Sequence, residues 1–294
     1  MSAPALKVKT PAKVNWALEV LRRRDDGFHE LALVFQAVGL WDELSFWKKA
    51  SGLELAVLES PVPLGTDPSN LVLRAARLFF EAAGLPEGLR VELTKRIPVA
   101  AGLGGGSSDA AATLWALNRL YGTDFSLAQL RHLGAQLGSD VPFFLTGGTA
   151  LGLGRGEQVT PWDPAPTRWL VLVKPQEGLS TPAVYGSGRA AFSTGEKALG
   201  MKAALTGGNG PLLAASLFNS LEPAAFHLLP EVEALKNGLL RAGALGALVS
   251  GSGPTVFGLA ADEAAARAVA EKMRTLAPTV WVVPTVAEGP RIVP

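Results

Sequence analysis

A glycine-rich string near the middle of the chain carries the clearest chemistry in the sequence. It reads Pro98-Val-Ala-Ala-Gly-Leu-Gly-Gly-Gly-Ser-Ser-Asp-Ala-Ala-Ala112 and leads from a predicted strand into an alanine-rich predicted helix. Glycines leave main-chain N–H groups uncovered, and amides that converge at a helix N-terminus attract phosphate; the alternative is an ordinary strand-to-helix turn. The predicted phosphate-binding residues are Pro98, Val99, Ala100, Ala101, Gly102, Leu103, Gly104, Gly105, Gly106, Ser107 and Ser108.

Two better-known phosphate loops do not match this string. A Walker A loop requires Gly-Lys-Ser/Thr, which is missing here. Counted from Gly102, the sixth position of a G-x-G-x-x-G fingerprint is Ser107, so the register for dinucleotide binding fails as well. A dehydrogenase is therefore a weak interpretation.

Two charged residues have neighbours that suggest catalysis. Asp140 precedes Val141-Pro142-Phe143-Phe144, which places a carboxylate at the edge of an apolar patch. There it could act as a general base or, alternatively, cap a helix. Lys13 lies in a strand-like segment, where an inward-facing ammonium needs an anionic partner. Asp140 or a phosphate would supply that partner; an ordinary solvated lysine is the alternative.

The composition excludes several other kinds of site. The chain has 294 residues, which allows two domains at roughly 150 residues each. It has no cysteine, so disulfides, thiolate metal sites and a cysteine nucleophile are ruled out, and its three histidines are scattered. Lys and Arg total 27 against 26 Asp and Glu, without a basic stripe, which argues against nucleic acid as a partner.

The sequence predicts a cytoplasmic protein without a membrane segment. The N-terminus lacks the apolar region of a secretion signal. Residues 242–261 carry no charge over about the length of a membrane span, but Ser250-Gly-Ser-Gly-Pro-Thr255 lies in their centre. We expect this stretch to be a helix end, a buried loop and a strand.

Mixed strands and helices without strict alternation predict an α+β fold. A helix is expected over Asn70–Ala83 with Ser69 as its N-cap, and residues 186–211 are small and polar enough to be mobile. A Pro- and Gly-rich stretch predicts a boundary between domains 1–155 and 156–294. The other predicted strands are 6–10, 14–21, 44–47, 53–58, 89–97, 149–153, 169–174, 255–259 and 280–286, and the other predicted helices are 107–120, 127–137, 230–241 and 262–276.

Three strings together resemble the motifs of the GHMP kinases, in the order found in that family. They are Pro11-Ala12-Lys13-Val14-Asn15, the central glycine-rich string, and Ser250-Gly-Ser-Gly-Pro-Thr-Val-Phe257. The resemblance spans almost the whole chain. It implies a two-domain fold, with an N-terminal ATP-binding domain that contains a left-handed βαβ unit and a C-terminal substrate domain.

Further strings resemble one branch of that family. They include Arg24-Asp-Asp-Gly-Phe-His-Glu-Leu31 and Gly138-Ser-Asp-Val-Pro-Phe-Phe144. Members of this branch use ATP and Mg²⁺ to phosphorylate the 2-hydroxyl of cytidylyl methylerythritol, in the non-mevalonate route to isoprenoid precursors. The resemblance implies that Asp140 is the base and that Lys13 polarises the acceptor hydroxyl.

The same resemblance implies roles for other residues. His29 would recognise the cytosine edge, with Phe28 and Tyr185 stacked on the base. The remaining implied substrate contacts are Asn15, Thr181, Gly251, Ser252 and Gly253, and the implied adenine contacts are Asn70 and Lys95. From residue type alone, a structural histidine, a turn asparagine, a surface tyrosine, a first-turn helix residue and a strand-face lysine remain alternatives.

The ligands of Mg²⁺ remain open at this stage. Ser107 or Ser108 could offer one oxygen, and we identify no glutamate for the metal. The alternatives to this function are another GHMP kinase, of the homoserine or mevalonate type, and a non-catalytic nucleotide-binding or RNA-binding module. The sequence does not decide between a monomer and a homodimer.

Overall fold

Two long strands, β1 (Leu6–Arg23) and β2 (His29–Lys48), form an antiparallel pair at the centre of the structure. The computed structural model describes residues 3–293. Residues 10–20 of β1 are buried without interruption, because other parts of the chain cover both faces of the strand. Strands of this kind are normally apolar throughout. The buried Lys13, Asn15 and Glu19 therefore need polar partners inside the protein.

The larger sheet has the strand order β12-β1-β2-β4-β3, with β5 added to β2, β6 added to β5 and β8 added to β1. β3 and β4 are parallel and are connected through helix α1, which gives the βαβ unit that the resemblance implies. The left hand of this crossover stays a prediction. The remaining strands of this sheet are β3 (Gly52–Glu59), β4 (Gly88–Thr94), β5 (Thr149–Gly154), β6 (Gln158–Pro161), β8 (Phe218–Asn219) and β12 (Arg291–Ile292).

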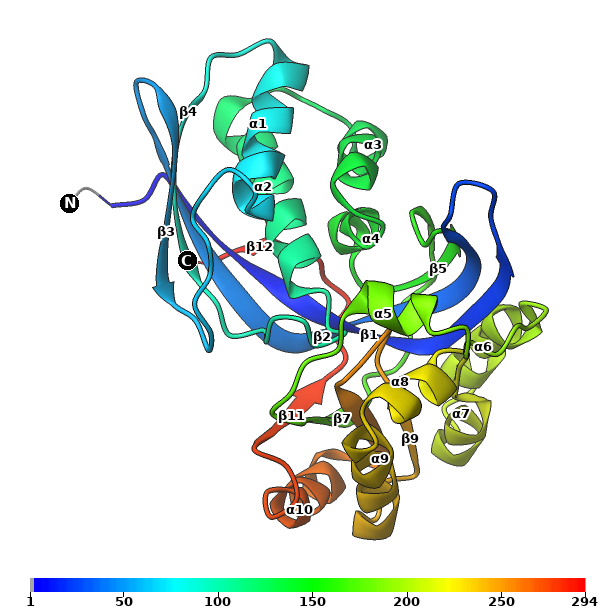
Figure 1. Ribbon diagram of the computed structural model, residues 1–294. Helices are drawn as coiled ribbons and strands as arrows, with labels where there is room; N and C mark the ends of the chain where they lie inside the picture. Colours follow the sequence, from blue (N-terminus) through cyan, green and yellow to red (C-terminus); the bar gives the residue numbers. More distant parts are fainter. Residues whose placement is uncertain (1–2, 294) are drawn as a thin grey trace.

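Four helices lie on one side of this sheet, as Figure 1 shows. They are α1 (Leu71–Ala83), α2 (Gly105–Tyr121), α3 (Leu127–Leu137) and α4 (Val141–Thr146). The central glycine-rich string forms the loop before α2 and about the first two turns of that helix. Alanines of α2 are buried against the sheet, so the helix approaches β1 closely. Apolar packing therefore fixes the position of the N-terminus of α2.

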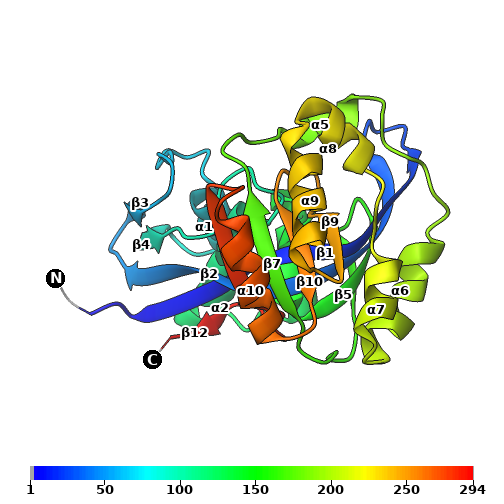
Figure 2. The same ribbon diagram turned by 90° about the horizontal axis from the view of Figure 1, so that it is seen from below.

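The smaller sheet has the order β11-β7-β10-β9 and is antiparallel throughout. Helices α9 and α10 lie side by side below it in Figure 1 and cross in front of it in Figure 2. Trp16 of β1 meets Phe257 of β10 edge to face at 5.6 Å, so the two sheets share a core. The elements are β7 (Trp169–Lys174), α9 (Glu231–Ala242), β9 (Gly246–Val249), β10 (Val256–Ala260), α10 (Glu263–Met273) and β11 (Thr279–Pro284).

Four short helices connect the two sheets. They are α5 (Thr181–Gly186), α6 (Glu196–Thr206), α7 (Gly210–Ser216) and α8 (Glu222–Leu228). Residues 186–211, whose composition predicts mobility, contain α6 and the start of α7. The predicted N-cap Ser69 is wrong by one position. Asn70 caps α1, since its Oδ1 accepts a hydrogen bond of 2.9 Å from the amide of Val72.

The boundary predicted after residue 155 lies in the turn between β5 and β6, which are paired strands of the larger sheet. The chain leaves that sheet only after β6. We therefore propose a boundary within residues 162–168, with β8 and β12 returning to the first sheet.

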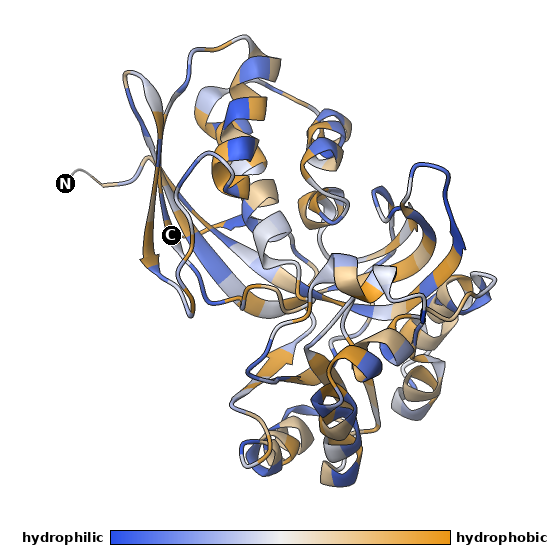
Figure 3. Cartoon of the chain, viewed as in Figure 1, coloured by the Kyte–Doolittle hydropathy of each residue, from blue (hydrophilic) through white to orange (hydrophobic). Residues whose placement is uncertain are grey.

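The uncharged stretch 242–261 contains the last residue of α9, strands β9 and β10, and a loop between the strands. In the part of the chain that is described, no helix combines the length and hydropathy needed to cross a bilayer. Figure 3 shows hydrophobic residues along the smaller sheet, whereas α9 and α10 carry both hydrophobic and hydrophilic residues. This is typical of helices with one buried and one exposed face.

Candidate active site

The N-terminal motif with Lys13, the central glycine-rich string and the C-terminal glycine motif meet at a cavity of about 1160 Å³. This cavity lies between β1, α2, α4 and α5. Of the predicted site residues, only Leu103, Ser108 and Gly253 do not line it. Those that do are Lys13, Asn15, Phe28, His29, Asn70, Lys95, Pro98, Val99, Ala100, Ala101, Gly102, Gly104, Gly105, Gly106, Ser107, Asp140, Thr181, Tyr185, Gly251 and Ser252.

The central and C-terminal glycine motifs touch backbone to backbone. Gly102 has φ +74°, and a Cβ at this position would lie 2.1 Å from the carbonyl oxygen of Ser250 and 2.9 Å from that of Gly253. The Ser250 hydroxyl donates to the Gly102 carbonyl at 3.0 Å, and the Thr255 amide donates to the Ala101 carbonyl at 3.3 Å. Gly253 thus contributes to the support of the loop rather than to the cavity wall.

The N-terminal motif joins the same contact. The Lys13 amide donates to the Leu103 carbonyl at 3.0 Å. Leu103 thus connects the glycine loop to β1 and does not line the cavity. A Cβ on Gly251 would stand 3.0 Å from Lys13 Nζ, so glycine leaves room for the ammonium group. Segments far apart in sequence therefore form one wall of the cavity.

Lys13 and Asp140 form an ion pair at this wall. Lys13 Nζ lies 3.5 Å from Asp140 Oδ2 and donates to Asn15 Oδ1 at 2.7 Å. The lysine is 4% exposed, whereas the Asp140 side chain is 29% exposed. Asp140 stands at the N-cap position of α4, yet its side chain makes no capping hydrogen bond. The carboxylate is thus free to meet a ligand, and the buried ammonium has the anionic partner that it needs.

Asn15 presents an unused donor next to this pair. It is 1% exposed, and its Nδ2 atom has no hydrogen-bond partner. A buried donor without a partner costs about 1–3 kcal/mol. A ligand acceptor in the cavity would remove that cost.

The N-terminus of α2 opens toward the cavity. Its N-cap residue, Gly104, has φ +71° and no side chain, so no side chain caps the first-turn amides. Ser108 takes no part in the cavity, because its hydroxyl lies 2.6 Å from the Pro11 carbonyl and 2.6 Å from Thr10 Oγ1. Those bonds fix α2 to β1. Of the two predicted serines, Ser107 is the one that lines the cavity.

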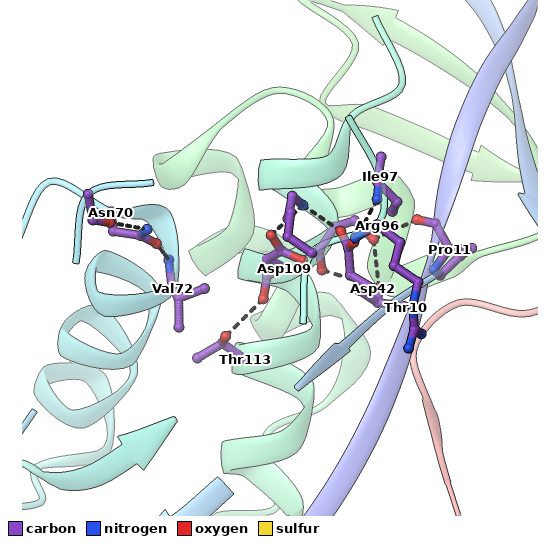
Figure 4. A network of polar contacts seen from close by, with 12 residues as sticks. Thr10, Pro11, Asp42, Asn70, Val72, Arg96, Ile97, Asp109 and Thr113 are labelled. Atoms are coloured by element: carbon purple, nitrogen blue, oxygen red, sulfur yellow. Dashed lines mark hydrogen bonds and ion pairs between the residues drawn. The ribbon is translucent and has the colours of Figure 1, made fainter. Parts of the chain in front are cut away.

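A buried ionic cluster lies beneath the first turn of α2, as Figure 4 shows. Lys95 Nζ donates to Asp109 Oδ2 at 2.6 Å and also to Asp42 Oδ2. The other oxygen of Asp42 accepts the amides of Arg96 and Ile97 at 2.6 and 2.8 Å. Two carboxylates thus hold the lysine that was predicted near adenine.

Burial has opposite effects on the acidic and basic members of this cluster. It raises the pKa of Asp109 well above its usual range, with a contribution from Asp42, although Lys95 opposes the shift. Burial opposes the charged form of Lys95, but the two carboxylates outweigh it and raise the pKa of that lysine. The cluster therefore stabilises the charged form of Lys95, whereas burial works against the charged form of Asp109.

Aromatic residues gather at the other end of the cavity. The rings of His29 and Tyr185 lie 5.1 Å apart and are tilted by 32°. Phe28 is 51% exposed, and the Arg155 guanidinium lies 4.8 Å from its ring centroid. Burial, with a smaller effect of Arg23, lowers the pKa of His29, so its imidazole is neutral near pH 7. Burial and the charge of Asp140 raise the pKa of the Tyr185 hydroxyl.

The protein oxygen atoms that line the cavity could bind Mg²⁺ only together with oxygen atoms of a bound substrate. Mg²⁺ takes oxygen ligands and usually keeps several waters and substrate phosphates. Ser107 and Asp140 line the cavity, but residues 3–293 contain no group of three or more His, Asp or Glu side chains that could hold a metal. These donors fit an ion that phosphates help to hold.

Sequence reasoning missed three polar residues of this region. Asp42 and Asp109 complete the cluster around Lys95, and Arg155 stacks on Phe28. Asp109 lies inside the recognised glycine-rich string, but its role depends on Lys95 and on Asp42 of another strand. Only the pairing of distant segments reveals these contacts.

The fold and the site define a two-domain GHMP-type kinase. The family models described as GHMP kinases N terminal domain and GHMP kinases C terminal match residues 70–148 and 201–279. The chain belongs to the GHMP kinase family, so the predicted family and its α+β fold are confirmed.

Several similar proteins belong to one branch of this family. A 4-diphosphocytidyl-2-C-methyl-D-erythritol kinase from Pelotomaculum thermopropionicum is 49% identical over 90% of this chain and 92% of its own. One from Moorella thermoacetica is 46% identical over 93% and 96%. A crystal structure of 4-(cytidine 5'-diphospho)-2C-methyl-D-erythritol kinase is 39% identical, with a TM-score of 0.80 over 95% of this chain and 99% of that one. A homoserine kinase from Cytophaga hutchinsonii, 23% identical with a TM-score of 0.76 over 98% and 97%, shares the fold.

Gly102→Ala should destabilise the protein by at least about 2 kcal/mol and abolish ATP binding. The new Cβ would collide with a backbone oxygen and would also hold a strained positive φ. Urea unfolding and nucleotide titration measure the two effects. Gly52→Ala is the matched control, because Gly52 has φ +76° and nothing within 4 Å of a Cβ. Equal effects of the two substitutions would contradict the close packing of the glycine loops.

Asp109→Asn should become more stable relative to the parent protein as the pH rises from about 4 to 8. The folded pKa of Asp109 lies above its unfolded value, so the folded parent binds this proton more tightly and loses stability as the pH rises. Asparagine has no such dependence. Urea unfolding at several pH values measures the difference.

Asp67→Asn provides a control of opposite sign. Hydrogen bonds from Ser69 lower the pKa of Asp67 below its unfolded value, so the parent gains stability over this variant as the pH rises toward about 4 and gains little more above that pH. The same trend in both variants would show that the ionisation of Asp109 is not the cause.

Proposed function

We propose that the chain transfers the γ-phosphoryl group of ATP to the 2-hydroxyl of 4-(cytidine 5'-diphospho)-2-C-methyl-D-erythritol, in the non-mevalonate route to isoprenoid precursors. One observation carries the proposal. A single cavity joins the uncapped N-terminus of α2, the Lys13–Asp140 pair and the aromatic group around His29. The names of the similar kinases, which align over nine-tenths of the chain, support the same substrate.

The glycine loop and the first turn of α2 bind the phosphates of ATP. Main-chain amides and the positive end of the helix dipole favour a polyanion without the need for cationic side chains. Asn70 and Lys95 lie at the adenine end of the cavity. Lys95 is already held by two carboxylates, so we assign it mainly to fixing the floor under α2.

Asp140 accepts the proton of the attacking hydroxyl. Its carboxylate is the exposed partner of the pair, and no capping bond competes for it. Lys13 holds that carboxylate in place and offers positive charge to the acceptor oxygen. Phosphoryl transfer depends mainly on such positioning and on charge stabilisation. Mg²⁺, when bound, would neutralise charge on the phosphate oxygens, and the Ser107 hydroxyl, which lines the cavity, would offer it a protein oxygen.

The alcohol substrate is recognised at the aromatic end of the cavity. The neutral imidazole of His29 can both donate and accept a hydrogen bond at the cytosine edge. Phe28 and Tyr185 supply flat apolar faces for stacking. Asn15 offers its unused amide donor to the substrate. The Thr181 and Ser252 hydroxyls, which lie 2.8 Å apart, contact the substrate diphosphate together with Gly251.

Two alternatives remain as outcomes of the assay. A kinase for homoserine or mevalonate shares the fold but does not require the His29 and Phe28 group. A nucleotide-binding module without catalysis does not require a Lys13–Asp140 pair. A cytoplasmic location stays a prediction from the sequence.

Asp140→Asn should lower kcat by at least about 100-fold and leave ATP affinity nearly unchanged. The substitution removes the proton acceptor but no phosphate contact. The assay contains the whole chain, ATP, Mg²⁺ and the cytidylyl alcohol, and it measures ADP and the monophosphorylated product. Asp163→Asn makes the same chemical change at a side chain that is 89% exposed, and it should have no effect. Turnover of homoserine or mevalonate, and none of the cytidylyl alcohol, would reject the proposed substrate.

His29→Ala should weaken binding of the cytidylyl alcohol by roughly 1–3 kcal/mol, because the base edge loses its hydrogen-bond partner. KM for the alcohol should rise, and KM for ATP should stay constant. His132→Ala, at an exposed position of α3, is the control. If KM rose for ATP and not for the alcohol, our assignment of the two ends of the cavity would be reversed.

A further inference from the structure

Glu19 is a buried carboxylate that the proposed mechanism does not use. It lies on β1, four residues after Asn15, and is fully buried. Among the described residues it takes part in no ion pair within 4 Å. It accepts hydrogen bonds from the amides of Ala198 and Gly195 at 2.8 and 3.2 Å, and from the Ser193 hydroxyl. Burial of a carboxylate is costly unless such donors surround it.

These bonds attach the segment between α5 and α6 to β1. Gly195 is the N-cap residue of α6 and has no side chain, so the Glu19 side chain of β1 caps this helix instead. The Ser193 amide donates to the Val20 carbonyl at 2.9 Å, and Phe192 forms a parallel bridge with Val20. Hydrogen bonds to Glu19 and Val20 therefore attach the segment before α6 and the first turn of that helix to β1.

The fixed segment presents an aromatic ring to the cavity. Phe192 is 64% exposed and lines the cavity wall. Along the pair of β1 and β2, Val20 faces Leu31 and Arg23 faces His29. Phe192, which is next to Val20, therefore lies at the His29 end and not at the end formed by α2. A ring so exposed gains free energy when a ligand covers it.

We infer that Phe192 is a further contact for the nucleoside end of the alcohol substrate, and that Glu19 is the positioning residue that holds this ring at the cavity. The inference rests on the proposed function, because it adds a contact residue to the binding site of the same substrate. It explains why a carboxylate is buried at a point of β1 where an apolar side chain would be easier to accommodate.

The test compares Phe192→Ala, Glu19→Ala and Glu19→Gln in the whole chain. Phe192→Ala should raise KM for the cytidylyl alcohol about tenfold and leave kcat, KM for ATP and the melting temperature nearly unchanged. Glu19→Ala should raise the same KM and also lower the melting temperature. Glu19→Gln retains one acceptor oxygen and should restore part of both. When Phe192 is already alanine, Glu19→Gln should raise KM no further, since the ring that it positions is gone.

Two controls separate this role from a merely structural one. Asp262→Ala removes the cap of α10, whose Asp262 Oδ1 accepts the Ala265 amide at 2.8 Å, far from the cavity. It should lower the melting temperature and leave KM unchanged. Leu199→Ala removes an apolar side chain of α6 that is 61% exposed and does not line the cavity, and it should change neither quantity.

Calorimetric binding of cytidine 5'-diphosphate distinguishes failure of the inference from failure of the proposed function. If the parent chain binds this probe and turns over the alcohol, but Phe192→Ala affects neither, the inference is wrong and the function stands. Weaker binding of the probe to Phe192→Ala supports the inference even if turnover is slow. A parent chain that neither binds the probe nor turns over the alcohol would overturn both.

Discussion

The ammonium group of Lys13 sits in a strand that is covered on both faces, and the rest of the site follows from this burial. An unpaired cation there would cost several kcal/mol. Asp140 lies at the start of α4 within 3.5 Å, Asn15 accepts a hydrogen bond, and Gly251 leaves the space that a Cβ would fill. Asn15 lies on the same strand as Lys13, whereas Asp140 and Gly251 come from distant parts of the chain. The charge therefore specifies how β1, α4 and the C-terminal loop must come together.

Much of the site could be predicted because its residues are adjacent in sequence. The glycine-rich string, Lys13 and Asp140 were each recognisable from their neighbours, and all reach the cavity. Asp42, Arg155, Glu19 and Phe192 were not recognisable, since each acts through a residue that is distant in sequence. The hydroxyl contacts of Ser108 also depend on residues that are distant in sequence. Its hydroxyl has the right position in the motif, but it is bonded to Thr10 and Pro11 of β1.

The fold was predictable where one face of an element is exposed. Helices α3, α9 and α10 have an exposed face and a recognisable capping residue at one end, and their predicted ranges are close to the observed ones. β2 is buried on both faces over much of its length, so alternation disappears, and only its end at residues 44–47 was recognised. Residues 186–211 look mobile by composition, but Glu19 supplies from β1 the cap that α6 lacks in its own sequence.

The contact of Gly102 with Ser250 joins residues that are 148 positions apart. A nucleotide that binds only the folded form of the loop would stabilise that form by mass action. It would therefore also stabilise the segments that hold the loop in shape. The second glycine motif connects β9 and β10 of the smaller sheet, so this linkage reaches strands that do not line the cavity. Local opening of either half would therefore disturb the glycine loop that we propose to bind phosphate.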